Sequence, residues 1–220
     1  MNFLDACKKT ARRCGVSNTP PTVVGQSGDL GLVVEWVQEA YVEVCGKWLN
    51  WKFLWSQHSL QTVDGQSAYP KPGDLSIWNH STIRIDGQLM EVLEYESVKD
   101  SWSPSANRGR SSLALIMPDN SLKLDPVPDG AYELTADYQR IASVPAENTD
   151  QFLIPEEHQQ VIIGRAMMLY AGYENAPEVK QDGLEIYEIA MAQLEAHQLP
   201  NTGNRNGVTE GSMDITVVPV

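Results

Sequence analysis

The chain has 220 residues, 42% of them hydrophobic, which is enough for one large domain or for a core domain with a sizeable insertion. Its formal net charge of -13 excludes a broad phosphate-binding surface, because affinity for nucleic acid depends on clustered Lys and Arg side chains. The three cysteines have no metal-ligand spacing, so neither a disulfide framework nor a zinc site is predicted.

The N-terminal stretch carries no targeting or membrane signal. Asp5, Lys8 and Lys9 interrupt the apolar run that a secretory signal requires. No stretch approaches the length of about 18 apolar residues that a membrane span needs. We therefore expect a cytosolic protein in a reducing compartment, without a membrane span.

The first predicted helix covers about residues 2–14. Asn2 is its expected N-cap and Gly15 its expected end. A connector with two prolines and two glycines follows at residues 17–28, and this composition predicts an ordered connector rather than a long disordered linker. We expect Val23 and Val24 to hold this connector against the core.

A second helix is predicted over about residues 29–48. Its apolar residues recur at three- and four-residue steps, which places them on one face. Glu35, Glu39 and Glu43 lie on the opposite face. The helix is therefore expected to bury one side and to show an acidic ridge to solvent.

An aromatic cluster follows directly, in the segment KWLNWKFLW. Aromatic faces can stack with unpaired bases, so a nucleic-acid platform is one interpretation. Only Lys47 and Lys52 supply positive charge nearby, which favours a buried hydrophobic joint between the helices and the next region. Carbohydrate stacking remains open. The aromatic residues are Trp48, Trp51, Phe53 and Trp55.

From residue 57 to about residue 140 the hydrophobic residues recur with a period of 2, whereas the preceding helical segments have a period of 3.6. Asp64-Gly65 and Asp86-Gly87 predict tight hairpin turns. Residues 96–102 suggest a short helix, and the composition of residues 103–112 predicts an exposed, mobile loop. We expect a small antiparallel β domain inserted between two pairs of helices.

Residues 155–199 predict two amphipathic helices joined by one tight turn, an αα-hairpin. Pro155 suits the first turn of a helix, and this helix is expected to end near Tyr173 or Glu174. Asn175 is then the expected N-cap of the next helix, with Glu178 completing a capping box.

The predicted fold class is α+β, with a four-helix core, an inserted antiparallel β domain and a flexible C-terminal tail. Only the segment DITVV in this tail has strand-like propensity. The expected division is residues 1–55 for the first part of the helical core, 56–140 for the β domain, 141–199 for the αα-hairpin, and 200–220 for the extended C-terminal tail.

No catalytic, cofactor or metal site is predicted. The string Glu156-Glu157-His158 could suggest a metal or acid–base site, but no second ligand follows at helical spacing. Acidic residues in the first turn of a helix explain the two carboxylates. Ser27, in GQSG, lacks the preceding strand and the full pattern of a nucleophile elbow. The other histidines, which are scattered singly, are His58, His80 and His197.

Three stretches of the chain carry a family resemblance. They are FLDACKKTARRCGVSNTPPTVVGQSGDLGLVVEWVQEAYVEV with the following WKFLW, then LKLDPVPDGAYELTADYQR, and then IPEEHQQVIIGRAMMLYAGYENAPEVKQDGLEIYEIAMAQLEAHQLP. With these segments in this order, the chain resembles the head-to-tail adaptor (connector) proteins of tailed bacteriophages, including tail-tubular proteins. The turn YENAPEV is the most family-like string, whereas residues 56–120 are similar only in length and β character.

The resemblance implies a structural, non-enzymatic role in the virion. Adaptors of this kind form a ring, implied here to be a dodecamer, beneath the portal protein. The ring would extend the DNA channel, through which double-stranded DNA passes without specific binding, and would offer a platform for a tail or nozzle protein. The implied location is the head–tail neck, with host cytoplasm as the place of assembly, and no cofactor is implied.

Two candidate interaction surfaces follow. One is a strand-like segment, expected to dock on the portal or on a neighbouring subunit by adding a strand to it. The other is the exposed acidic side of the αα-hairpin, facing either subunit neighbours or the DNA channel. The first surface comprises Met213, Asp214, Ile215, Thr216, Val217 and Val218, and the second comprises Glu185, Glu188 and Glu195.

An alternative function places the activity in the β domain. That domain would be a carbohydrate- or receptor-binding module carried by a virion protein, and the helices would only attach it. This alternative expects Trp78 and Trp102 to be exposed, because stacking on a glycan needs a free aromatic face.

Overall fold

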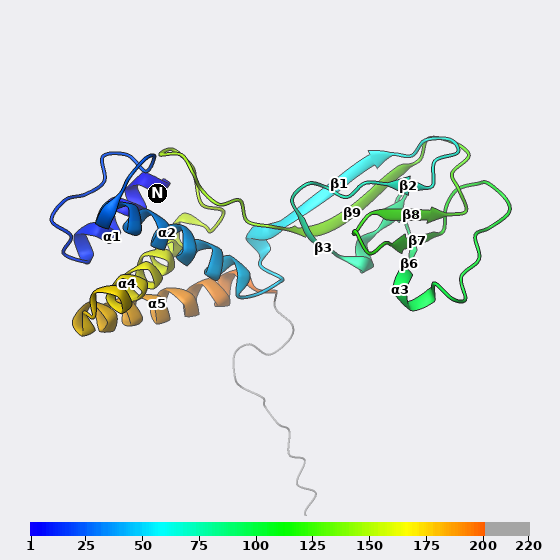
Figure 1. Ribbon diagram of the computed structural model, residues 1–220. Helices are drawn as coiled ribbons and strands as arrows, with labels where there is room; N and C mark the ends of the chain where they lie inside the picture. Colours follow the sequence, from blue (N-terminus) through cyan, green and yellow to red (C-terminus); the bar gives the residue numbers. More distant parts are fainter. Residues whose placement is uncertain (201–220) are drawn as a thin grey trace, which may run out of the picture.

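The computed structural model describes residues 1–200 as a helical lobe and a β lobe that meet at a narrow joint (Figure 1). The predicted docking segment of residues 213–218 lies outside the described residues. The helical lobe contains α1 (Phe3–Arg13), α2 (Gly28–Gly46), α4 (Gln160–Glu174) and α5 (Pro177–Gln198). The predicted four-helix core is therefore confirmed.

The start of α1 and the connector that follows it agree closely with the sequence. The Asn2 side chain accepts a hydrogen bond from the Asp5 amide at 2.8 Å, and Gly15 has a positive φ of 73° just past the helix end. Val23 is buried, but Val24 is 55% exposed, so the expectation that both valines hold the connector is wrong for Val24.

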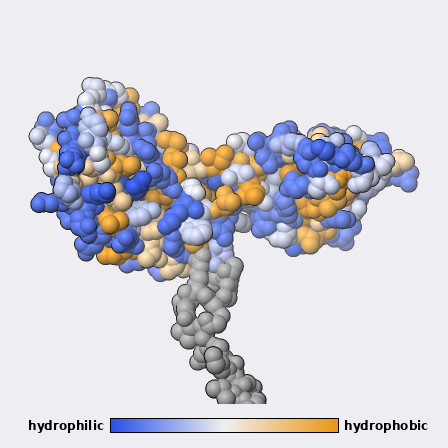
Figure 2. Space-filling model, turned by 60° about the horizontal axis from the view of Figure 1, so that its bottom comes forward, coloured by the Kyte–Doolittle hydropathy of each residue, from blue (hydrophilic) through white to orange (hydrophobic). Residues whose placement is uncertain are grey.

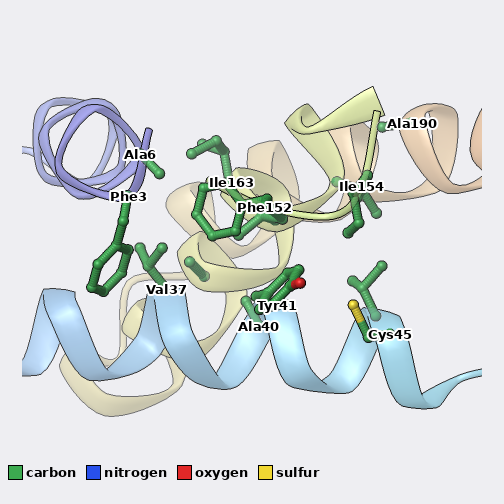
Figure 3. Close-up of a cluster of buried hydrophobic side chains, with 14 of the residues drawn as sticks. Phe3, Ala6, Val37, Ala40, Tyr41, Cys45, Phe152, Ile154, Ile163 and Ala190 are labelled. Carbon is green, nitrogen blue, oxygen red and sulfur yellow. The ribbon is translucent and has the colours of Figure 1, made fainter. Parts of the chain in front are cut away.

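The core of the helical lobe forms where α1, α2 and α4 converge on the segment that precedes α4 (Figure 3). The Phe152 ring, from that segment, packs edge-on against Phe3 at 6.2 Å and is tilted against Tyr41 at 5.1 Å between ring centroids. The Tyr41 hydroxyl accepts a hydrogen bond from the Leu153 amide at 3.3 Å. This segment therefore belongs to the core and is not a loose connection from the β lobe.

Helices α4 and α5 cross at two glycines. A Cβ atom added to Gly164 would lie 2.6 Å from the Tyr187 amide nitrogen, and one added to Gly183 would lie 2.9 Å from the Gly164 carbonyl oxygen. Real Cβ atoms do not approach backbone atoms so closely. The two backbones can pack at this distance only because neither residue has a side chain.

The turn between these helices differs from the prediction. Asn175 is in the left-handed conformation (φ 52°, ψ 46°) and ends α4, so it is not the N-cap of α5. Ala176 takes the N-cap position and has no side chain that can cap, and Pro177 is the first residue of α5. Asparagine tolerates positive φ better than most residues, and a residue before proline avoids helical geometry. These two preferences outweigh the capping-box pattern.

The β lobe holds two sheets. One has the order β1 (Trp55–Gln61), β9 (Glu133–Arg140), β4 (Arg84–Ile85), β5 (Gln88–Leu89), and β3 (Leu75–Trp78) also pairs with β9. The other has the order β2 (Ala68–Tyr69), β8 (Leu122–Asp125), β7 (Leu113–Ile116), β6 (Glu91–Glu94).

The pairing corrects two details of the expected antiparallel domain. Strands β6 and β7 run parallel, whereas the other pairs are antiparallel. Asp86-Gly87 joins the paired strands β4 and β5 as predicted. Asp64-Gly65 forms a turn between β1 and β2, but these strands pair with β9 and β8, so it is not a hairpin. Turn residues specify a local reversal and do not specify which strands then pair.

The chain between β6 and β7 begins with the short helix α3 (Tyr95–Val98) and continues through the expected exposed loop. Two serines are among the residues that attach this loop to the rest of the lobe. Ser105 donates two hydrogen bonds to the Asp125 carboxylate, at 2.9 Å from the amide and 2.8 Å from the hydroxyl. The Ser111 hydroxyl donates to the Pro126 carbonyl at 2.7 Å.

We predict that Gly164→Ala destabilises the fold by roughly 1–3 kcal/mol, because the new methyl group forces α4 and α5 apart. Gly172→Ala in the same helix is the matched control, since nothing lies within 4 Å of its added Cβ. The control should raise stability by about 0.5–1 kcal/mol through helix propensity. Urea unfolding followed by circular dichroism measures both changes. Equal effects of the two substitutions would contradict the close crossing.

Candidate interaction surfaces

The joint between the lobes is built from the aromatic cluster. Trp51 is fully buried, donates a hydrogen bond from its indole nitrogen to the Val44 carbonyl at 3.1 Å, and stacks on Phe53 at 5.2 Å between ring centroids. Trp48 and Trp55 are each about half exposed. The interpretation as a hydrophobic joint is therefore confirmed for the centre of the cluster, and its two outer rings extend to the surface.

An apolar groove runs along this joint. Residues from the end of α2, from the chain after it and from the chain after β9 line the groove together. Leu49 and Ile141, both in the lining, are 68% and 60% exposed. Figure 2 shows hydrophobic surface gathered where the two lobes meet. Exposed apolar surface of this kind is typical of a site that contacts another macromolecule.

The carboxylates on the acidic side of α5 differ in their surroundings. Glu185 and Glu188 are exposed, as expected. Glu195 is half-buried, forms an ion pair with Lys47 at 2.9 Å and accepts a hydrogen bond from the Trp48 indole at 2.9 Å. Glu195 therefore also ties the last turns of α5 to the end of α2.

Two arginine side chains pair with carboxylates. Arg165 pairs with Glu43 of the acidic ridge on α2. In the β lobe, Arg108 pairs with Asp64. Each of these two arginines therefore has a carboxylate beside it.

The tryptophans of the β lobe do not form an open stacking platform. Trp78 is only 4% exposed, and its indole nitrogen donates to the Asn120 carbonyl at 2.8 Å. Its ring packs edge-on against Tyr138 at 5.8 Å between centroids. Trp102 is half-buried, with the Lys123 ammonium 4.7 Å from its ring centroid. The exposure that the carbohydrate-binding alternative requires is absent at Trp78.

A histidine pair closes the C-terminal end of α5. His158 Nε2 lies 3.1 Å from His197 Nδ1, and the Lys52 ammonium donates to the His197 carbonyl at 3.1 Å. One imidazole must donate and the other accept, so this contact is lost when both rings are protonated. In the sequence His197 stands alone and His158 belongs to the string Glu156-Glu157-His158, so only the fold brings the two imidazoles together.

The environment of His158 disfavours its charged form. The side chain is 3% exposed, and its Nδ1 atom is buried without a hydrogen-bond partner. Burial lowers the pKa of His158, an effect that the Glu157 carboxylate at 3.9 Å opposes and His197 reinforces. His158 is thus a neutral structural group that packs the end of α5 onto the lobe.

The described residues offer little for catalysis or metal binding. Within residues 1–200, no group of three or more His, Cys, Asp or Glu side chains could hold a metal ion. Burial raises the pKa of Cys7, Cys14 and Cys45 to about 12, so these thiols are protonated and unreactive. Ser27 precedes α2 without a strand before it, so no nucleophile elbow forms there. Over the same residues, no helix is long and apolar enough to cross a membrane.

We predict that acid destabilises the protein partly through His158. Its pKa is lower in the folded chain than the ordinary 6.5, so the unfolded chain binds the proton first and stability falls as the pH drops below about 6.5. His158→Gln should therefore show a smaller loss of melting temperature between neutral pH and pH values below 6.5. Unchanged pH dependence in His158→Gln would contradict this assignment.

Comparison with known proteins identifies the family. Residues 1–209 match the family described as SU10 adaptor protein. The match spans both lobes, including the β region that resembled adaptors only in length and character, and it points away from catalysis. No curated protein matches the sequence. The chain therefore belongs to the SU10 adaptor protein family of bacteriophage structural proteins.

Proposed function

We propose that this adaptor forms a dodecameric ring beneath the portal protein of a tailed bacteriophage, in the head–tail neck of the virion. The ring extends the DNA channel and provides the attachment platform for a tail or nozzle protein, as a tail-tubular protein does. The family match over residues 1–209 is the observation that carries this proposal. Assembly takes place in the host cytoplasm, from subunits without a cofactor.

The charge distribution supports a channel that DNA crosses without binding. The chain carries a formal net charge of -13, and Arg108 and Arg165 are each paired with a carboxylate. Exposed carboxylates, among them Glu185 and Glu188, repel a phosphate backbone. In this proposal the acidic side of α5 faces the channel or a subunit neighbour, and Glu195 contributes to it from the joint.

The apolar groove supports a subunit contact. A ring requires a heterologous interface, in which one surface of each subunit meets a different surface of the next. The groove at the joint is exposed and apolar in the single chain. A neighbour that covers it would contact both lobes. The helical lobes then form the ring body, and the β lobes project toward the tail components.

Residues 213–218 are proposed to dock on the portal or on a neighbouring subunit by adding a strand. The alternation of Met213, Asp214 and Ile215, followed by β-branched residues, has the character of a strand. Twelve residues, 201–212, separate it from the helical lobe, which is a tether long enough to reach a partner.

We predict that the full chain mixed with its portal particles forms a ring on one face of each particle. Electron microscopy of the mixture would show the added density and its rotational symmetry. A ring with a symmetry other than twelvefold would correct the copy number alone. Portal particles that show no added density, even with the adaptor chain in large excess, would refute the proposed function.

We also predict that truncation after Pro200 weakens portal binding by about tenfold or more, because strand addition contributes main-chain hydrogen bonds. A chain truncated after Ser212 keeps the tether but lacks the docking segment, so it is the matched variant. It should bind as weakly as the shorter chain in a sedimentation assay. Full binding by the chain that ends at Ser212 would show that residues 213–218 are not the docking element.

A further inference from the structure

Strand β1 is an open edge of its sheet. All seven of its residues pair with β9 on one side, and within residues 1–200 no strand pairs with its other side. None of the seven residues is buried, whereas β9 buries Leu134, Ala136 and Tyr138. The backbone groups of alternate β1 residues therefore point away from β9 toward solvent.

This edge lacks the features that protect other edges. Native proteins shorten edge strands, interrupt them with bulges, or place Lys, Pro or inward charges along them. The sequence of β1, WSQHSLQ, contains no Lys, Arg, Asp, Glu or Pro, and its register with β9 is unbroken. By contrast, β2 and β5 have two residues each, β6 has Glu at both ends, and the register of β3 is interrupted.

The described chain ends near the first residue of β1. Pro200 lines one surface pocket together with Trp55, the first residue of β1. Twelve residues separate Pro200 from Met213, and the thirteen Cα–Cα steps between the two residues span at most about 45 Å when fully extended. Strand β1 is about 23 Å long at the usual rise per residue. Residues 213–218 of the same chain can therefore reach any part of the open edge.

We infer that residues 213–218 cover the open edge of β1 in the free subunit, as a sixth strand of the first sheet. The short tether favours this intramolecular pairing, because it holds the segment near the edge at a high effective concentration. When residues 213–218 bind the portal, they first dissociate from the edge of β1. The inference rests on β1 and the tether and does not depend on ring formation.

The alternation of the segment matches the two faces of β1. Ser56, His58 and Leu60 face the core of the β lobe, where Leu60 packs against the buried cluster. An added strand places Met213, Ile215 and Val217 on one face and Asp214, Thr216 and Val218 on the other. The face with Ile215 suits the half-buried side of β1, and the face with Asp214 suits the side of Gln57.

Amide hydrogen exchange of the free full-length chain tests this inference. Alternate β1 amides should exchange at least about tenfold more slowly in the full chain than in a chain truncated after Pro200. Ile215→Asp should abolish this protection, because it places a charge against the core. Thr216→Asp, on the solvent face of the added strand, is the matched control and should keep the protection.

Two results would overturn the inference. Equal exchange of β1 amides in the full and truncated chains would show that the edge is open in the free subunit. Protection that depends on protein concentration, together with a dimer in sedimentation, would assign the edge to a second copy. Neither result bears on portal binding, so the inference and the proposed function can fail separately.

Discussion

The close crossing of α4 and α5 is the contact on which the helical lobe depends. Gly164 and Gly183 let the two backbones touch, and this contact sets the direction in which α5 runs. The helix therefore reaches the joint, where Glu195 meets Lys47 and the last turn lies over His158. A wider crossing would move the end of α5 away from the joint and would leave His158 exposed.

The joint connects the inserted β lobe to the helical lobe through two adjacent chain segments. The β lobe leaves the helical lobe at Trp55 and returns through Arg140, and these two residues lie at the same end of the paired strands β1 and β9. Arg140 donates a hydrogen bond to the Phe53 carbonyl at 3.3 Å, and the Phe53 ring stacks on the buried Trp51. Because entry and exit are adjacent, the helical core closes without any contribution from the strands, and two separate hydrophobic clusters form. The division at residues 55/56 and 140/141 stays a prediction.

Local patterns in the sequence were sufficient for the elements and insufficient for their partners. Helical periodicity, the Asn2 cap and the Asp86-Gly87 turn each depend on a few neighbouring residues, and the structure contains all of them. The parallel pairing of β6 with β7 and the contact of His158 with His197 join residues far apart in the chain. Nothing in the local sequence specifies such contacts, because they result from how whole elements pack.

Asn175 and the glycine pair show a different limit. The string around Asn175 satisfies two local rules, a capping box and a left-handed helix end, and only the geometry of the following proline decides between them. Gly164 and Gly183 look unfavourable inside helices when each helix is considered alone. Their value appears only when two helices meet. A glycine inside an amphipathic pattern is therefore a usable signal for a close helix crossing, and it was available in this sequence.

Unpartnered features of the described chain gather around the joint, and this has a mechanical consequence. The apolar groove, the exposed face of Trp55 and the point where the chain leaves α5 at Pro200 all lie there. A partner bound at this place would touch the helical lobe through Leu49 and the chain after β9 through Ile141. Such a partner would fix the angle between the lobes as well as occupy a surface. The orientation of the β lobe would then become fixed when that partner binds.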